Sequence, residues 1–304
     1  MSRRLAIAGP VLGIGIALGL GACAQAPQDS GVIVFTGLLA GQRGAGGYYA
    51  EAPDGANRRK LRFAATDFDL SFSADGRFAA WRDTRPLNTE PIVVARSDGR
   101  GGGVVPLPRV AGAVSPSLSP DGKRLAIVYT PDAGGPQHSW NVWLVAPNGR
   151  GLRRLTAIGN VITAAWSPDG ARIAFVVQAS DADRTLNTGE IYVVGSDGRA
   201  LHRVARGREP SWSPDGRRLA FTDPRYRVDV VDGSGGAIHA VSRNAVGPAW
   251  SPDGKRLAFT RTVPCGSEGC PHTIVVADVD AHAEHTIGPT FGGSSELVWT
   301  TALR

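Results

Sequence analysis

The feature that most constrains this 304-residue chain is a Ser-x-Asp-Gly tetrapeptide that recurs along it. One copy lies within the decapeptide Trp250–Phe259. Pro252 fixes φ near the value needed at the second position of a type I turn, and Gly254 can take a positive φ. The side chains of Ser251 and Asp253 can accept hydrogen bonds from nearby backbone N–H groups. Each copy of the motif therefore predicts a tight β-hairpin.

The hairpin signal is repeated at a regular interval. The turns fall at residues 73–76, 119–122, 167–170, 213–216 and 251–254. An apolar residue comes before each turn: Phe72, Leu118, Trp166, Trp212 and Trp250. Strand-type repeats of about 40–50 residues are the signature of propeller blades.

A second signal within the repeats shows how the strands are covered. Apolar runs occupy 92–95, 142–145, 191–194, 228–231 and 274–277. Most of these runs lack the alternation of a strand with one wet face, so both faces should be buried. No segment after the N-terminal region has a helical period long enough to supply parallel crossovers. Sheets must therefore cover sheets, as stacked blades do.

The two ends of the chain contain complementary parts of one further repeat. Residues 32–35, 48–52 and 61–63 have the character of strands but lack a first strand, and 296–299 resembles a first strand with nothing after it. Joining them would close a ring and remove its open edges. We therefore predict an all-β, six-bladed propeller of four-stranded antiparallel blades over residues 31–304. The predicted blades are 65–109, 110–157, 158–207, 208–243, 244–288, and 289–304 combined with 31–64.

The N-terminal region has the organisation of an export signal. Arg3 and Arg4 precede an apolar stretch, Leu5–Leu20, and Leu20-Gly21-Ala22-Cys23 resembles the bacterial lipobox. The resemblance implies acyl chains such as palmitate on Cys23, residues 1–22 as a lipoprotein signal peptide, and 23–30 as a tether. The expected location is therefore exported and membrane-anchored, facing the periplasm or the cell exterior. A plain signal peptide or an uncleaved anchor is the alternative.

Two further cysteines, Cys265 and Cys270, lie close together in the sequence. In an exported protein an even remainder of cysteines predicts one disulfide. The alternative is a metal pair with His272, but these three side chains are too few for a closed zinc site. We expect no metal and no cofactor.

The repeats resemble those of the TolB-type β-propeller, with the pattern Trp-Ser-Pro-Asp-Gly-Lys/Arg-x-Leu-Ala-Phe. The resemblance is close at Trp166, Trp212 and Trp250 and covers nearly all of the chain after Cys23. TolB itself has an α/β domain before its propeller. Only about eight residues separate Cys23 from the first strand, so we expect that domain to be absent.

The charge of the chain is modest. The formal net charge is +6, and removing Arg3 and Arg4 with the signal leaves +4. No basic run is interleaved with aromatic residues, so no nucleic-acid partner is expected. We expect a monomer.

The loops between second and third strands are predicted at 36–47, 81–91, 129–141, 177–190, 221–227 and 261–273. They are unlike in length and sequence, which favours a scaffold that presents a binding face. The candidate binding residues are Arg82, Asp83, Arg85, His138, Trp140, Asp181, Asp183, Arg184, Asp223, Arg225 and Tyr226. The alternative is that these loops are polar only because they are solvated.

No catalytic motif accompanies the repeats: the sequence lacks a Gly-x-Ser-x-Gly elbow, a phosphate-binding loop and His-Glu-x-x-His. We therefore predict a non-enzymatic, lipid-anchored scaffold that binds a protein or peptide of the cell envelope. One alternative is an enzyme, such as a lactonase, glycan hydrolase or lyase, with its site at the channel mouth. A third possibility is glycan binding through Trp140 and Tyr226.

Overall fold

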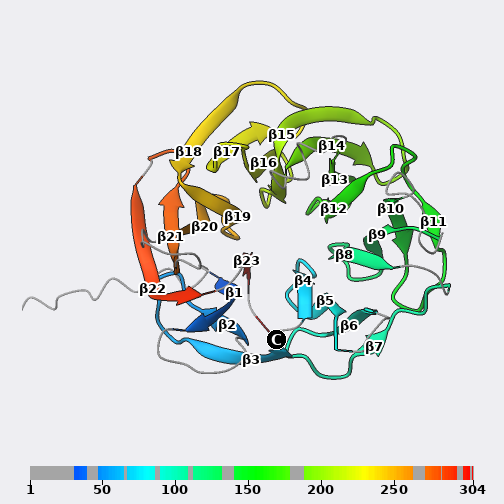
Figure 1. Ribbon diagram of the computed structural model, residues 1–304, viewed down its shortest axis with the longest axis horizontal. Helices are drawn as coiled ribbons and strands as arrows, with labels where there is room; N and C mark the ends of the chain where they lie inside the picture. The colour runs from blue at the N-terminus through cyan, green and yellow to red at the C-terminus, as the bar shows by residue number, and fades with distance from the viewer. Residues whose placement is uncertain are drawn as a thin grey trace, which may run out of the picture.

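The structure is a computed structural model. It describes residues 31–39, 47–64, 67–85, 90–108, 112–131, 140–178, 188–262, 271–281, 283–292, 297–301 and 303. Within these ranges the regular secondary structure consists of strands, arranged as a ring around a central axis (Figure 1). In the described part of the chain, no helix has the length and apolar character needed to cross a bilayer.

The described strands pair into six four-stranded antiparallel blades. Blade I consists of β4 (Asp67–Phe72), β5 (Phe78–Asp83), β6 (Ile92–Arg96) and β7 (Gly103–Val104). Blade II consists of β8 (Ala113–Leu118), β9 (Leu125–Tyr129), β10 (Asn141–Val145) and β11 (Arg153–Arg154). Blade III consists of β12 (Val161–Trp166), β13 (Arg172–Val177), β14 (Gly189–Gly195) and the first part of β15 (His202–Trp212).

The remaining blades complete the ring. Blade IV consists of the second part of β15, β16 (Arg218–Thr222), β17 (Arg227–Asp232) and β18 (Ile238–Arg243). Blade V consists of β19 (Ala245–Trp250), β20 (Arg256–Thr262), β21 (His272–Asp278) and β22 (Glu284–Gly292). Blade VI consists of β23 (Leu297–Thr300), β1 (Val32–Leu39), β2 (Gly47–Glu51) and β3 (Arg59–Ala64).

The two ends of the polypeptide build blade VI together, as predicted. β23 pairs with β1 in antiparallel register, with Ile33 opposite Trp299. β1 continues to Leu39, beyond the predicted end of that strand at residue 35. Its last residues, Leu38 and Leu39, pair with β22 of blade V, so the loop that was expected to begin at 36 starts later. The ring is thus closed by backbone hydrogen bonds between the two termini.

β15 differs from the prediction, because one continuous strand belongs to two blades. It pairs with β14 through residues 202–207 and with β16 through 208–212, so the predicted boundary at 207/208 falls inside a strand. Gly207 lies at the crossing, where an added Cβ would be 2.5 Å from the Thr222 carbonyl oxygen. A side chain at this position would keep the two strands apart, which explains the glycine.

The Ser-x-Asp-Gly turns have the expected geometry. In the copy at 251–254, the Gly254 N–H donates to the Ser251 carbonyl at 2.9 Å and Gly254 has a φ of 70°. The Ser251 hydroxyl donates to Asp253 at 2.5 Å and accepts from the Arg256 N–H at 2.9 Å. The other four turns repeat the Ser-to-Asp bond. The predicted hairpins are therefore confirmed.

Neighbouring blades are joined by a contact that the repeat motif encodes. The Arg that begins a second strand stacks on the Trp that ends the first strand of the next blade, as Arg218 does on Trp250 with Cζ 4.7 Å from the ring centroid. Three more such pairs are Arg124–Trp166, Arg172–Trp212 and Arg256–Trp299. The hydrophobic core fills the spaces between blades, where Phe175, Phe221 and Phe259 are fully buried.

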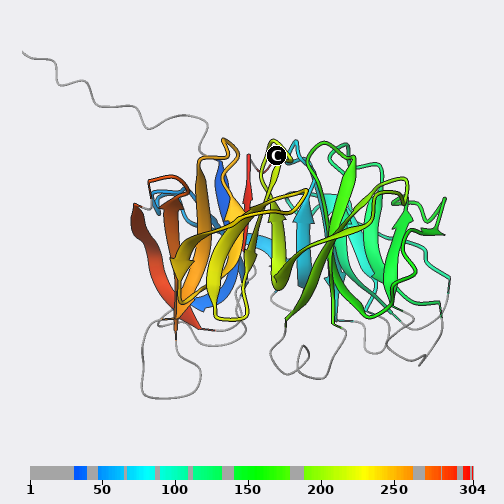
Figure 2. The same cartoon turned by 90° about the horizontal axis from the view of Figure 1, so that it is seen from above.

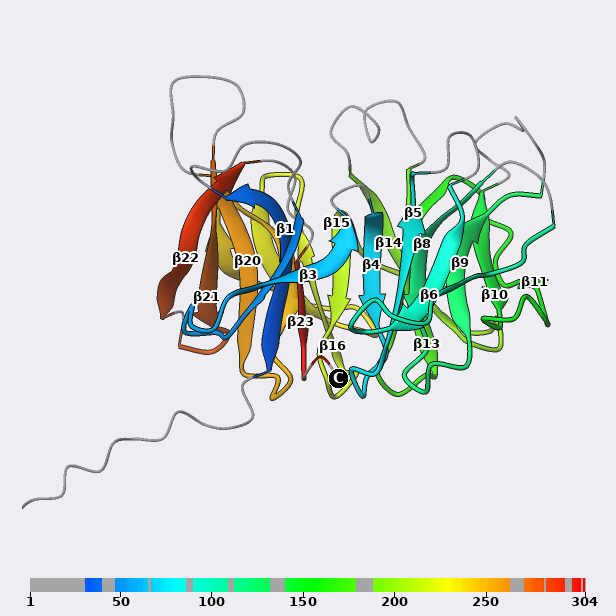
Figure 3. The same cartoon turned by 90° about the horizontal axis from the view of Figure 1, so that it is seen from below.

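The ring has two unlike faces (Figure 2). The turn face, at the top of Figure 2, carries the Ser-x-Asp-Gly turns and the turns between third and fourth strands. The loop face carries the links between second and third strands and those between blades. Figure 3 shows both faces from the opposite side, with the turn face below.

Candidate functional site at the loop face and channel mouth

The six innermost strands enclose a channel along the axis, with a volume of about 680 Å³. Toward the turn face it is lined by Pro168, Pro214 and Pro252 from the repeated turns. Toward the loop face the lining is polar and comes from the residue three positions before the aromatic or leucine that precedes each turn. The described members of this ring are Asp69, Ser115, Thr163, Glu209 and Gly247.

A β-bulge sets the direction of these side chains. Four of the innermost strands shift register at this position, and Asp69, Ser115 and Glu209 have φ values of 59°, 51° and 54°. A bulge inserts one unpaired residue and re-aims its side chain, which is why bulges occur at the rims of sheets. The left-handed backbone costs of order 1 kcal/mol at each non-glycine residue.

The polar ring forms hydrogen bonds between blades. The Ser115 N–H donates to Asp69 Oδ2 at 3.1 Å, and the Ala164 N–H donates to Ser115 Oγ at 3.1 Å. The Gly247 N–H donates to Glu209 Oε2 at 2.9 Å. In each case the side chain of one blade accepts from the backbone of the next. These side chains therefore link neighbouring blades along the channel wall. The bulges supply the donors, because they leave backbone N–H groups without a partner in the strand ladder.

The predicted residues of blade I form a compact ion-pair network at this rim. Arg82 reaches Asp69 in the channel at 3.1 Å and Glu90 at 2.9 Å. Asp83 accepts from the Arg85 guanidinium through both oxygens, at 2.7 Å each. The hydrogen bonds from Arg85 lower the pKa of the Asp83 carboxyl below its usual value.

The predicted residues of blade IV form a rigid, exposed corner. Asp223 is buried and accepts from the N–H groups of Arg225 and Arg227, at 2.9 and 2.8 Å. Tyr226 has a φ of 58°, and the residue is 51% exposed. The guanidinium of Arg208 stacks on the Tyr226 ring, with Cζ 4.8 Å from the centroid.

A buried charge group lies beneath this corner. Arg227 bridges two carboxylates, with 2.8 Å to Asp223 and 3.1 Å to Asp229. Asp229 is 1% exposed, and burial raises the pKa of its carboxyl despite the nearby guanidinium. The network fixes the base of the corner, so Arg225 and Tyr226 are presented from a stiff support.

Sequence reasoning missed three residues of this rim: Asp69, Arg208 and Glu209. Arg208 is largely buried and lies 3.6 Å from Glu209, which connects the blade IV corner to the channel mouth. The available signal was the repeat itself. Aligning the copies on their turns places Asp69 and Glu209 at the same position, three before Phe72 and Trp212.

The other predicted residues do not join these two groups. Trp140 is half-buried and packs against the core between blades II and III, with its ring over Gly112. His138, Asp181, Asp183, Arg184, Cys23, Cys265 and Cys270 lie outside the described residues. Blades I and IV stand three places apart in a ring of six, so the two described groups lie across the axis from each other. Among described residues, no group of three His, Cys, Asp or Glu could hold a metal ion.

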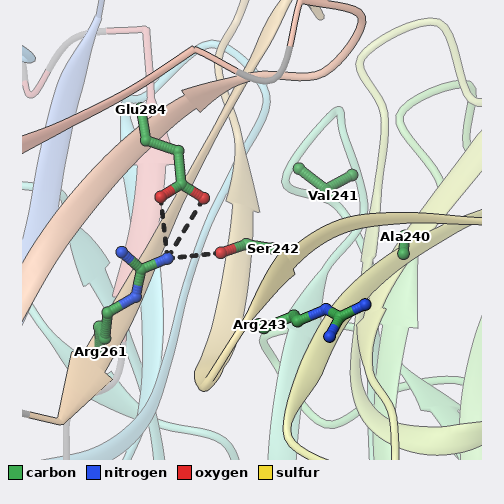
Figure 4. Close-up of a pocket in the computed structure, with 6 residues that line it drawn as sticks. All are labelled: Ala240, Val241, Ser242, Arg243, Arg261 and Glu284. Atoms are coloured by element: carbon green, nitrogen blue, oxygen red, sulfur yellow. Dashed lines mark hydrogen bonds and ion pairs between the residues drawn. The ribbon is translucent and has the colours of Figure 1, made fainter.

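A second cavity, of about 490 Å³, lies between blades IV and V, away from the channel (Figure 4). Arg261 spans it, donating to Ser242 at 2.6 Å and pairing with Glu284 at 2.9 Å. Arg243 lies at its edge and points away from this pair in Figure 4. The polar groups of this cavity thus bond mainly to one another.

No protein-family model matches the sequence, and no curated protein matches it. Among solved structures, TolB from Acinetobacter baumannii aligns over 90% of this chain and 67% of its own, with 17% identity and a TM-score of 0.69. A putative TolB from Agrobacterium tumefaciens aligns over 87% and 91%, with 18% identity and a TM-score of 0.63. An oligogalacturonate lyase from Vibrio parahaemolyticus aligns over 87% and 80%, with 13% identity and a TM-score of 0.55.

These likenesses establish the fold. The chain shares the β-propeller fold with TolB structures, as its repeats suggested, and also with an oligogalacturonate lyase. At such low identity a common fold carries no activity, so function has to be argued from the site.

Proposed function

We propose that this chain is an exported, lipid-anchored β-propeller that binds a protein or peptide of the cell envelope through its loop face. The observation that supports this most is the blade IV corner. Tyr and Arg are the side chains that most often dominate binding energy at protein interfaces, and here Tyr226 and Arg225 are both exposed.

The corner is already organised for binding. Tyr226 is held by two backbone hydrogen bonds, from its N–H to Asp223 and from the Ala245 N–H to its carbonyl, at 3.0 and 2.9 Å. A residue whose backbone is already held in place loses less conformational entropy when a partner binds. The left-handed backbone at Tyr226 is a local strain of the kind often found at functional positions.

A pull-down from envelope extracts after crosslinking tests this proposal. The wild-type chain should recover a reproducible protein or peptide, and Tyr226→Ala with Arg225→Ala should lower recovery at least tenfold. Arg199→Ala, an exposed change on the turn face, is the control and should leave recovery unchanged. Equal recovery by all three proteins, or no reproducible partner, would contradict a binding role for this face.

The lipid anchor rests on the lipobox-like sequence at Cys23. The expected product carries acyl chains, including palmitate, and faces the periplasm or the cell exterior. Labelling with palmitate followed by mass analysis should find the modification in the wild type and not in Cys23→Ser. We also propose a Cys265–Cys270 disulfide, which should appear as a gain of two hydrogens in intact mass upon reduction.

The alternative of an enzyme at the channel mouth would use the carboxylates there. Two are described, Asp69 and Glu209, and each accepts a backbone N–H of the next blade. Both carboxylates therefore hold neighbouring blades together, and this structural role favours the binding function over catalysis. If Asp69→Asn or Glu209→Gln abolished turnover of a sugar or lactone substrate while leaving the melting temperature unchanged, the enzyme reading would replace ours.

A further inference from the structure

The turn face concentrates the positive charge of the molecule. The segments 73–77, 119–124, 167–172, 213–218 and 251–256 contain eight Lys or Arg against five Asp. Two turns between third and fourth strands add Arg58 and Arg59, beside Asp54, and Arg150, Arg153 and Arg154. The chain contains three lysines, Lys60, Lys123 and Lys255, and all three are exposed. Lys123 and Lys255 lie in turns of this face. Lys60 instead lies within β3, opposite Tyr49 of β2, and an added Cβ at Gly47, at the loop-face end of β2, would be 2.7 Å from its Cε.

The two faces also differ in how many of their basic side chains form salt bridges. On the turn face, Arg77 and Arg172 pair with the Asp of their own turns. Lys123, Arg154 and Lys255 are exposed and have no salt-bridge partner among the described residues. On the loop face, Arg82 and Arg227 pair with carboxylates at 3.1 Å or less. Exposed basic side chains without a salt bridge among the described residues are therefore more numerous on the turn face, where Arg150 and Arg217 also belong to this set, than on the loop face, where Arg225 and Arg243 do.

The described part of the chain also begins on this face. Gly31 precedes β1 and lies against the turn of blade V, where an added Cβ would be 2.7 Å from Pro252 Cγ. Residues 24–30 can span at most about 25 Å when fully extended. If Cys23 carries the acyl anchor of the proposed function, the turn face is tethered within that distance of the bilayer.

We propose that the turn face docks against an anionic lipid surface and so directs the loop face away from the membrane. This orientation rests on the proposed anchor for proximity, and on the unpaired Lys and Arg side chains for its direction. Attraction to an anionic surface acts within a Debye length of about 8 Å and amounts to about fivefold in binding per basic residue. Leu201 and Ile238, which follow turns on this face, are 47% and 49% exposed and could enter the headgroup region.

The two turn-face lysines provide a built-in assay. The processed full chain is reconstituted in phosphatidylcholine vesicles, with or without about one third phosphatidylglycerol, and labelled with an amine-reactive reagent. Docking predicts that Lys123 and Lys255 label at least fivefold more slowly on the anionic vesicles, and that about 0.5 M salt restores the rate. An amine introduced on the loop face by Arg225→Lys should label equally on both vesicles.

Removing basic residues tests the docking, and comparing chains with acylated and unacylated Cys23 separates the docking from the anchor. Arg153→Gln with Arg154→Gln should return the labelling of Lys123 and Lys255 on anionic vesicles toward the neutral-vesicle rate, and Arg225→Gln should not. Equal labelling on both vesicles by an acylated chain would overturn the docking and leave the anchor intact. Salt-sensitive sedimentation and lysine protection on anionic vesicles by an unacylated chain would support the docking and reject the anchor.

Discussion

At the scale of single residues, Arg227 forms ion pairs with two buried carboxylates of blade IV. It lies between Asp223 and Asp229, both nearly inaccessible to water. Removing one partner of a buried ion pair leaves the other charge unpaired, which costs more than the pair contributes when intact.

Arg227→Met should therefore destabilise the fold by about 1–3 kcal/mol. This is less than for a fully buried ion pair, because the Arg227 side chain is 33% exposed and solvent screens its charge. Arg225→Met removes an exposed neighbour that has no salt bridge among the described residues, so it should change stability by less than about 0.5 kcal/mol. Urea unfolding at pH 7 measures both.

The same variant has a predictable pH dependence. Burial already raises the pKa of Asp229, and loss of Arg227 removes the charge that lowers it. A carboxyl whose pKa is raised in the folded state destabilises that state above this pKa and ceases to do so as pH falls through it. The deficit of Arg227→Met relative to wild type should thus shrink between pH 7 and pH 4, and a constant deficit would contradict this account.

The turn carboxylates behave in the opposite sense. The Ser73 hydroxyl lowers the pKa of Asp75 to about 2, and desolvation opposes this only in part. The stability that Asp75 contributes is present above its unfolded pKa, near 3.9, and is lost as pH falls through about 2. Asp75→Asn should be less stable than wild type at pH 6 and equal to it below pH 2. In Ser73→Ala, an NMR titration should find the Asp75 pKa moved upward.

At the scale of elements, the hairpin turn joins blades as well as strands. The residue that begins each second strand in blades II to V stacks on the aromatic ring of the next blade. The guanidinium of Arg218 also donates to the Gly254 carbonyl at 3.3 Å, so one side chain contacts both the ring and the turn of blade V.

Arg218→Ala should consequently lower the free energy of unfolding by about 1–2 kcal/mol through loss of the stack and of its packing. Arg217→Ala provides the comparison, because Arg217 is the preceding residue, is exposed and stacks on no ring among the described residues. Thermal unfolding should separate the two variants by several degrees, and equal melting temperatures would rule out the stack as a stabilising contact.

At the scale of the whole molecule, the ring depends on two strands that are far apart in the sequence. β23 provides the innermost strand of blade VI, and its Trp299 packs in a core with Ile33 and Phe35 of β1. Without β23 both β1 and the inner surface of blade V lose their cover, and an open propeller presents unpaired strand edges.

Deletion of residues 297–304 should therefore abolish cooperative unfolding and cause association, whereas deletion of Arg304 alone should be tolerated. Calorimetry and size-exclusion chromatography distinguish these results. A monomeric, cooperatively folded product of the longer deletion would show that the termini do not close the ring.

Much of this architecture was readable from the sequence because its determinants are local. Ser251, Pro252 and Gly254 specify a turn by their own backbone preferences, and five spaced copies of that turn imply blades. The pairing of Ile33 with Trp299 was also predictable, since each end of the chain lacked what the other supplied.

The site could be predicted only in part. Asp223, Arg225 and Tyr226 were expected on one loop, because a polar loop between two buried strands must lie at a rim. The residues that support this loop were not predicted. Arg208 and Asp229 belong to strands, and no local rule places them beneath the loop. The roles of Asp69 and Glu209 depend on bulges that turn each side chain toward the next blade, which is a property of the closed ring.

The sequence alone thus determined the repeating hairpin, the number of blades and the way the ring closes, because turn chemistry and hydrophobic pattern act over a few neighbouring residues. The tertiary structure decided which charges are neutralised and which remain open to solvent. Ion pairs form between residues that only the packing of blades brings within a few ångströms, so the contrast between the two faces appears only once the ring is built.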